Sequence, residues 1–212
     1  MDCVVTPLKT LMGFSVHLNV QLKFYNLPLR KLYIILSSLL TALVVFTCCN
    51  NTTNAATLMR KPIDYTQSSE TVNYPDLSKV HHLNILVIIH QNRVYLRAGN
   101  HVIYTMYCSA GVKDPKTSHT TTPLGTYYIQ NEHGQSFYNS SLKEGANYWT
   151  SFKNHGEYLF HTVPTDAQGN YKPEEAAKLG KDTGSHGCIR LNIPDAKFIQ
   201  TVPVNTPVKI EE

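Results

Sequence analysis

The chain has 212 residues, of which 42% are hydrophobic and 16% are charged, and its formal net charge at pH 7 is +4. This length accommodates one domain with additional chain at one end and excludes a large multidomain assembly. The hydrophobic fraction excludes a fully disordered chain, and so small a charge excess gives no reason to expect a nucleic-acid partner.

The first 56 residues differ from the rest in charge and hydrophobicity. They carry four basic residues against one acidic residue, whereas the remaining chain carries 15 against 14. Arg30 and Lys31 precede the apolar run 32–47, and the next charged residue is Arg60. A basic flank followed by a hydrophobic run is the order that directs membrane insertion. We therefore expect residues 1–56 to form an N-terminal extension that takes the protein out of the cytoplasm.

The length of the apolar run leaves its fate open. Its 16 residues lie between a typical signal-peptide core and the ~20 residues that span a bilayer. A cleaved signal peptide, a retained membrane anchor and a lipid-bearing Cys48 are all compatible with this length. Thr47 stands where a lipoprotein signal usually has a smaller residue, so lipidation ranks third.

Residues 57–80 are polar and have no apolar period. Pro62, Pro75 and several Ser and Thr residues interrupt this stretch, which predicts a linker between the extension and a domain at 81–212.

The domain is predicted to be mostly β. Short runs of β-branched and aromatic residues recur between turn-forming residues. These runs are 84–90, 93–97, 101–108, 124–130, 148–152, 157–161, 188–192 and 208–211. Helical signals are limited to 173–180, which begins at Pro173 and ends at Gly180, and to 194–201. The sequence thus predicts a mostly β domain with two short helices.

The reactive residue types gather at 183–191. Cys188 has His186 and Arg190 close by in the chain, and a neighbouring imidazole or cation is what activates a thiol as a nucleophile. Gly187 permits a positive φ and a turn whose N–H groups could face a carbonyl under attack. His161 ends a predicted strand, and the sheet could bring this second imidazole beside the thiol.

Other interpretations of these residues remain open at this point. A single cysteine is often a buried apolar residue. A zinc site would need His161, His186 and Cys188 together with Asp166 or Asp182, but the spacing lacks the close pairs typical of structural sites. We therefore expect no metal and no other cofactor.

The segment Ser185-His186-Gly187-Cys188-Ile189-Arg190-Leu191, with the upstream His161, resembles the signature of the L,D-transpeptidase catalytic domain family (YkuD type). Two further segments, Thr122–Tyr127 and Cys108–Gly111, are similar to segments of that family and occur in the same order. The resemblance spans about residues 82–211. It implies a mixed β-sandwich with a cysteine acyltransferase site.

The resemblance also implies a substrate and a reaction. Cys188 would attack the carbonyl between the third, diamino residue and the D-Ala of a peptidoglycan tetrapeptide stem, releasing D-Ala and forming a thioester. The amine of an acceptor stem would then resolve the thioester into a 3-3 cross-link. His161 would transfer the protons, oriented by a carbonyl or hydroxyl group at Thr162. The predicted location is the bacterial cell wall, with the protein either membrane-anchored or secreted.

The remaining candidate residues have supporting roles. Ser185, His186 and Gly187 are expected at the oxyanion site, together with the Cys188 amide. Arg190 is assigned either to the stem carboxylate or to an internal ion pair. Trp149 and Tyr148 are candidates for the walls of the peptide groove, with core packing as the alternative for Trp149.

Two features depart from the family pattern, and three other functions stay open. The spacer Thr162–Gly184 is long and is a candidate lid, and Thr162 stands where Gly or Ser is more usual. Water as acceptor would make the protein an L,D-carboxypeptidase, and loss of the reactive geometry would leave a wall-binding module. A Cys108 nucleophile, in the residue order of NlpC/P60 peptidases, would give a hydrolase. The oligomeric state is left open.

Overall fold

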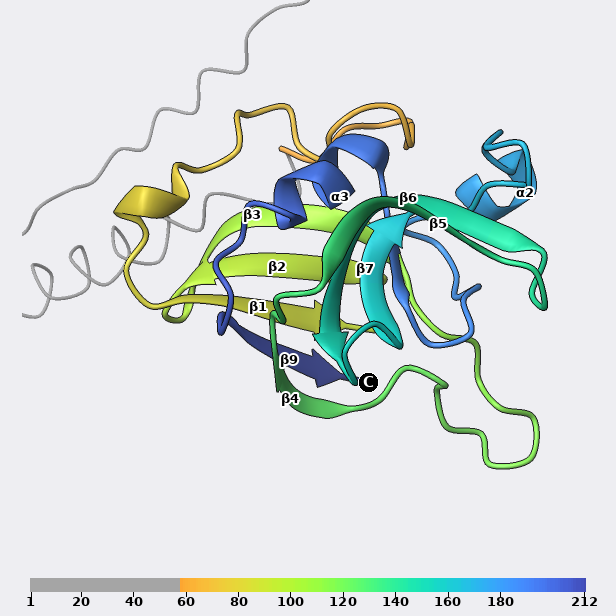
Figure 1. Ribbon diagram of the computed structural model, residues 1–212. Helices are drawn as coiled ribbons and strands as arrows, with labels where there is room; N and C mark the ends of the chain where they lie inside the picture. The colour runs from red at the N-terminus through yellow and green to blue at the C-terminus, as the bar shows by residue number, and fades with distance from the viewer. Residues whose placement is uncertain (1–57) are drawn as a thin grey trace, which may run out of the picture. The chain divides into compact units, whose positions relative to one another are not determined.

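The computed structural model describes residues 58–212 (Figure 1). The predicted N-terminal extension 1–56 and its apolar run 32–47 lie outside the described residues. The strands are β1 (Leu83–Ile88), β2 (Arg93–Ala98), β3 (His101–Ser109), β4 (Gly125–Tyr128), β5 (His133–Asn139), β6 (Glu144–Lys153), β7 (Tyr158–Thr162), β8 (Ile189–Leu191) and β9 (Pro207–Glu211). The helices are the 3₁₀ turn η2 (Leu77–Lys79), α2 (Pro173–Ala176) and α3 (Ile193–Ile199).

The strands of residues 58–212 form one nine-stranded sheet in the order β4-β9-β1-β2-β3-β8-β7-β6-β5. The pairs β1–β9 and β7–β8 are parallel and the other neighbours are antiparallel, which confirms the predicted mixed, mostly β fold. The sheet curls so that its two ends face one another (Figure 1). Phe152 of β6 and Phe160 of β7 therefore share one core with Val87 of β1. The predicted sandwich is thus two halves of a single curled sheet.

The predicted elements differ from the observed ones in a few places. Strand β5 was not predicted, because its sequence HGQSFYN has no alternation of apolar and polar residues and most of its side chains are exposed. It is an edge strand that pairs with β6, whose observed range is twice as long as the predicted one. The predicted helix 173–180 closes after one turn, at Ala176.

Part of the stretch predicted as a linker packs against the sheet and α3. Ser69 and Glu70 are buried. The Ser69 hydroxyl donates to Asp195 Oδ2 of α3 (2.5 Å) and accepts from the Tyr107 N–H (2.7 Å). Glu70 Oε1 accepts from the Thr105 N–H (2.8 Å). The polar composition that suggested a free linker therefore supplies buried hydrogen bonds, which compensate the cost of burying these groups. Within 58–212, no helix is both long and apolar enough to cross a bilayer.

Candidate active site

Three segments that are far apart in the sequence meet around the loop 184–188. The Ser185 N–H donates to the Ala110 carbonyl at the end of β3 (3.0 Å). The Thr122 hydroxyl donates to the Gly187 carbonyl (3.0 Å) and accepts from the Gly111 N–H (2.8 Å). These are the segments singled out in the sequence, and the contacts show that the first two hold the third in place.

Hydrogen bonds between residues of the loop 184–188 also stabilise it. The Ser185 hydroxyl donates to the Cys188 carbonyl (2.6 Å) and accepts from the Gly187 N–H (3.0 Å). Gly187 has a φ of +139°, and a Cβ at this position would lie 2.9 Å from Cε1 of Tyr158. Glycine is therefore needed here for both conformation and space. Because the Gly187 N–H is bonded to the Ser185 hydroxyl, it is not free in this structure for the oxyanion that the sequence assigned to it.

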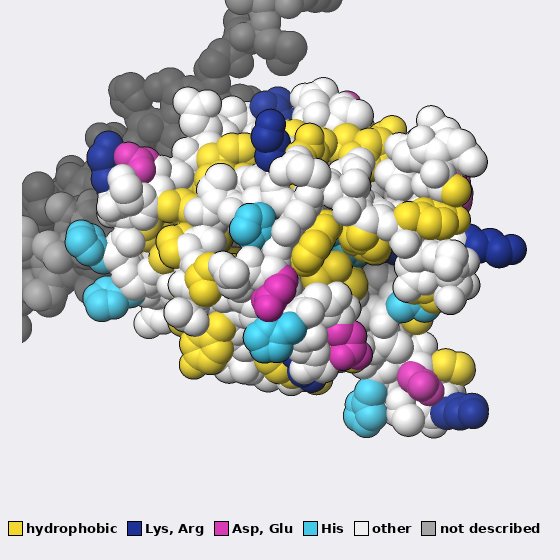
Figure 2. Space-filling model, in the orientation of Figure 1, with side chains coloured by type: hydrophobic (Ala, Val, Ile, Leu, Met, Phe, Trp, Pro, Cys, Tyr) yellow, Lys and Arg dark blue, Asp and Glu magenta, His cyan; other side chains and the backbone are white. Residues whose placement is uncertain are grey.

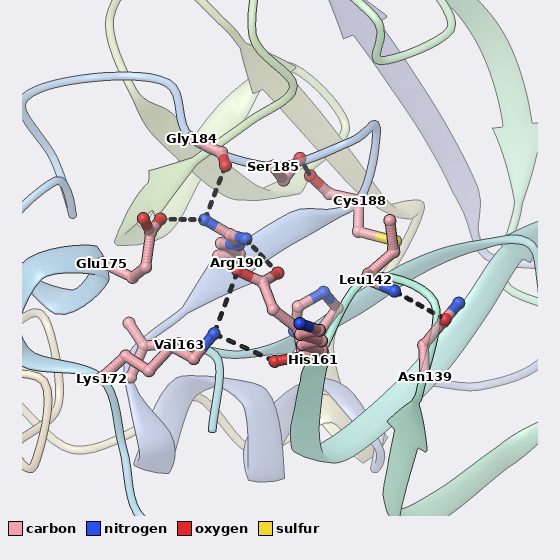
Figure 3. Close-up of polar contacts among 12 residues, drawn as sticks. Asn139, Leu142, His161, Val163, Lys172, Glu175, Gly184, Ser185, Cys188 and Arg190 are labelled. Carbon is pink, nitrogen blue, oxygen red and sulfur yellow. Dashed lines mark hydrogen bonds and ion pairs between the residues drawn. The ribbon is translucent and has the colours of Figure 1, made fainter. Parts of the chain in front are cut away.

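The register of the sheet brings the thiol and the imidazole to one place. Strands β7 and β8 are parallel, with His161 opposite Arg190, and Cys188 immediately precedes β8. Cys188 and His161 both line a cavity of about 330 Å³ (Figure 3). The other lining residues are Phe137, Asn139, Leu142, Glu144, Gly145, Trp149, Gly156, Glu157, Tyr158, Leu159, Pro164, Ser185, His186 and Arg190.

His161 is oriented by the backbone. Its Nδ1 lies 2.6 Å from the Thr162 carbonyl oxygen. Because a carbonyl only accepts, Nδ1 carries the ring proton and Nε2 is left with a free lone pair. Burial, with a contribution from the positive charge of Arg190, lowers the pKa of His161 to about 4. At neutral pH the imidazole is therefore uncharged and able to accept a proton.

Thr162 supports this arrangement through its side chain as well as its carbonyl. Its hydroxyl donates to the Val163 carbonyl (2.9 Å) and accepts from the Asn147 N–H (3.0 Å). The hydroxyl thus ties the end of β7 to β6, and the carbonyl is the group that contacts His161. The sequence left open whether a carbonyl or a hydroxyl group orients His161. The structure shows that the Thr162 carbonyl does so.

The Cys188 thiol is partly exposed and uncharged. It donates to the Glu157 carbonyl with a sulfur–oxygen distance of 3.7 Å. Burial raises the pKa of Cys188 to about 11, although a backbone N–H and the charge of Arg190 act in the opposite direction. The site at rest therefore holds a neutral thiol and a neutral imidazole, not a thiolate–imidazolium pair.

Cys108 has none of these features. It is completely buried, it pairs with Leu191 across β3 and β8, and burial raises its thiol pKa to about 12. Both thiols are free, and Cys108 is absent from the cavity lining. The alternative with Cys108 as nucleophile is therefore wrong.

Arg190 forms an internal ion pair. Its side chain is 2% exposed, and its guanidinium donates to Glu144 Oε2 (2.8 Å), Glu175 Oε2 (2.5 Å) and the Gly184 carbonyl (2.8 Å; Figure 3). Of the two roles open for Arg190, the structure shows the internal one. Through these contacts, Arg190 links the loop 184–188 to β6 and to α2.

The long spacer 162–184 acts as a brace and not as the predicted lid. Helix α2 supplies Glu175 to Arg190, and Leu179 is fully buried. Of the spacer residues 162–184, Pro164 alone lines the cavity. The opposite wall comes instead from the hairpin β5–β6. The sequence indicated Trp149 of β6 as a wall residue, but it did not indicate Phe137 and Asn139 because β5 was not predicted.

The remaining candidates separate into two groups. His186 is exposed and lines the cavity, as does the half-buried Trp149, which packs against Gly134. Tyr148 is absent from the lining, and its ring lies under Lys197 Nζ at 5.8 Å from the centroid. Tyr148 is therefore packed on α3 and does not form a groove wall. Among residues 58–212, no three His, Cys, Asp or Glu side chains are grouped so that they could hold a metal ion.

Comparisons with known proteins identify relatives. The family model described as "L,D-transpeptidase catalytic domain" (YkuD) matches residues 84–210. The Bacillus subtilis (strain 168) protein named "Putative L,D-transpeptidase YciB" is 42% identical over 161 residues, which are 76% of this chain and 80% of that protein.

Two mycobacterial proteins are among the solved structures that match this chain. An L,D-transpeptidase from Mycobacterium smegmatis matches with a TM-score of 0.48 and 19% identity, and the match covers 62% of this chain and 59% of that one. An L,D-transpeptidase from Mycobacterium tuberculosis H37Rv matches with a TM-score of 0.46 and 22% identity, over 62% and 58% of the two chains. The chain thus spans less than two thirds of either structure.

Proposed function

Because this chain belongs to the L,D-transpeptidase catalytic domain family, we propose that it is a cysteine acyltransferase that joins peptidoglycan stem peptides by 3-3 cross-links. One observation carries the proposal: Cys188 lines the same cavity as His161, whose free Nε2 is fixed by the hydrogen bond from Nδ1 to Thr162. A nucleophile, a base and a group that orients the base are the minimum set for acyl transfer through a covalent intermediate.

In the first half-reaction, the sulfur of Cys188 attacks the carbonyl between the diamino residue and D-Ala, and His161 Nε2 takes the thiol proton. The C–N bond then breaks, the imidazolium returns the proton to the leaving D-Ala amine, and a thioester remains. In the second half-reaction, the acceptor amine attacks the thioester and gives a proton to His161. The C–S bond breaks, and the departing thiolate takes up that proton.

The oxyanion of each tetrahedral intermediate needs donors other than the Gly187 N–H. We assign this role to His186, whose exposed side chain lines the cavity, and to the Cys188 N–H. Trp149 supplies an apolar wall for the stem peptide.

Product analysis tests the function. The purified full-length chain, incubated with disaccharide-tetrapeptides, is expected to release D-Ala and yield 3-3 dimers separable by chromatography and mass spectrometry. Accumulation of tripeptides without dimers would show that water is the acceptor and that the protein is an L,D-carboxypeptidase. Recovery of unchanged tetrapeptides that remain bound would instead show a wall-binding module.

Because Cys188 and His161 are both uncharged at neutral pH, the rate of acylation should depend little on pH. Acylation needs an unprotonated His161, whose pKa is about 4, and a protonated Cys188, whose pKa is about 11. The second-order rate constant for acylation by a carbapenem should therefore vary little from about pH 5 to about pH 9. An acid limb near the ordinary histidine pKa of about 6.5 would contradict this account, because it would indicate an imidazole that charges in the working range.

The location of the protein is part of the proposal. The basic flank and the apolar run 32–47 support export across the cytoplasmic membrane, with the catalytic domain acting at the cell wall. Fractionation of cells that produce the full-length chain tests this, because a purely cytoplasmic pool would exclude contact with the stem peptides.

A further inference from the structure

The cavity lining contains one arginine, Arg190, and two carboxylates, Glu144 and Glu157. The guanidinium of Arg190 is neutralised by Glu144 and Glu175, and Glu144 lies 3.7 Å from Lys172 Nζ. Glu157 is the other carboxylate in the lining, and among residues 58–212 it has no ion-pair partner. Of the two carboxylates in the lining, Glu144 is therefore paired with cations and Glu157 is not.

Glu157 stands beside the nucleophile. Its backbone carbonyl is the group that accepts the Cys188 thiol proton, at a sulfur–oxygen distance of 3.7 Å. Its exposed side chain lines the same cavity, with Tyr158 next to it in the wall. A charged group bound by this carboxylate would therefore lie within one side-chain length of the reacting carbonyl.

The turn that presents Glu157 is fixed by hydrogen bonds. Asn154, His155 and Gly156 all have positive φ angles, between 49° and 108°. The His155 N–H donates to Gln130 Oε1 (2.9 Å), and the Gly156 N–H donates to the Ser151 hydroxyl (2.9 Å). The Asn154 amide also donates to Glu157 Oε2 (2.7 Å) and restrains the carboxylate. Such restraint lowers the entropy lost when a ligand binds.

A carboxylate in this position selects for a cation. On the face shown in Figure 2, acidic and histidine side chains lie both near the middle and at the rim, whereas Lys and Arg side chains lie mainly toward the rim. Lys153, the last residue of β6, has its Nζ over the rings of Tyr127 and Tyr158 at 5.1 Å from each centroid and forms no ion pair with Glu157. A primary ammonium can therefore approach Glu157 without displacing an ion-pair partner.

We propose that Glu157 binds the side-chain ammonium of the diamino residue of a stem peptide and so determines specificity at the cavity. The inference rests on the proposed function, which supplies a substrate with such a group. Two sources share this chemistry: the third residue of the donor stem and the amine of the acceptor stem.

The proton balance differs between the two sources. A donor ammonium keeps its proton through acylation and acts only as a bound cation. An acceptor ammonium has three N–H protons: one is released to solvent when the free amine forms, one passes through His161 to the departing thiolate, and one stays in the new amide. Neither case needs an additional reactant.

The experiment compares the purified full-length chain with Glu157→Gln, which keeps the shape of the side chain and removes its charge. D-Ala release is measured with the tetrapeptide donor varied at fixed amine, and dimer or amide formation with Nα-acetyl-lysine amide varied at fixed donor. We expect one of the two KM values to rise on the order of tenfold, and the KM that rises identifies the source. High salt should reduce the difference, because the carboxylate is exposed.

Two controls make the result specific. Glu174→Gln removes an exposed carboxylate outside the cavity and should leave both KM values at the wild-type level. Hydroxylamine, an acceptor that is uncharged at the assay pH, should show the same KM with wild type and with Glu157→Gln.

Two results would overturn the inference: both KM values within twofold of wild type, or a fall in kcat with both KM values unchanged. The second result would mean that Glu157 positions Cys188 and binds no cation. A covalent adduct of Glu157→Gln with a penem that lacks a cationic side chain confirms that the variant is folded and reactive. Failure of the wild-type chain to form that adduct would count against the proposed function itself and not against Glu157 alone.

Discussion

Replacement of His161 by alanine is expected to slow acylation of Cys188 by roughly 10²–10⁴-fold, the usual contribution of a positioned general base. The physical reason is the high pKa of the thiol, about 11, which leaves almost no thiolate at neutral pH without a base. Nε2 of His161 supplies that base, because Nδ1 is committed to the Thr162 carbonyl. The measurement is the acylation rate with a carbapenem, followed by stopped-flow absorbance.

The pH dependence of the variant separates a lost base from a damaged fold. Without His161, acylation should depend on free thiolate, and its rate should rise about tenfold per pH unit toward the thiol pKa. His101→Ala, which removes an exposed imidazole on β3, is the matched control and should react like the wild type. A variant with the wild-type rate and the wild-type flat profile would exclude His161 as the base.

Replacement of Arg190 by methionine is expected to lower the free energy of unfolding by about 3–5 kcal/mol, the cost of breaking a buried ion pair by removing one partner. The guanidinium is almost fully buried and bonds two carboxylates and the Gly184 carbonyl. Its loss leaves Glu144 with Lys172 at 3.7 Å and Glu175 with Lys178 at 2.7 Å. Urea unfolding of both chains at neutral pH measures the difference.

The difference in free energy of unfolding between the wild type and Arg190→Met should become smaller in acid. The reason is the titration of Glu175. Burial alone would raise the pKa of Glu175, but Lys178 and Arg190 outweigh that effect and hold the pKa below its ordinary value. The wild type therefore gains stability above the unfolded-state pKa and loses it as the pH falls. Without Arg190 the pKa of Glu175 rises, so protonation costs the variant less, and the two stabilities should converge. Equal stabilities at neutral pH would show that these contacts of Arg190 are energetically unimportant.

Much of the fold could be predicted because its strands follow local rules. The runs at 84–90, 93–97 and 101–108 are rich in β-branched and aromatic residues, and they match β1, β2 and β3 closely. Strand β5 follows no such rule, because its pairing with β6 holds it in place while most of its side chains face solvent. The packing of 58–80 also depends on distant partners, such as Asp195 for Ser69.

The sequence indicated several of the residues that line the cavity but not most of the contacts that hold them in place. The resemblance named His161 and Cys188 together, but their shared cavity depends on the parallel register of β7 and β8, which spacing in the sequence does not determine. The partners of Arg190 come from β6 and α2, and no local pattern links those carboxylates to it. Glu157 was missed for a different reason. The sequence does not show which acidic residues are paired in the fold, so it could not single out Glu157 as the unpaired carboxylate of the cavity.

The central claim is that Cys188 is the nucleophile of an acyl-transfer site. The most direct test is intact-mass analysis of the full-length chain after exposure to a carbapenem, with peptide mapping of the product. We expect a single covalent adduct on Cys188 of the wild type and no adduct on Cys188→Ala, in which the buried Cys108 remains. An adduct that persists in Cys188→Ala, or a wild-type chain that forms none, would contradict the claim.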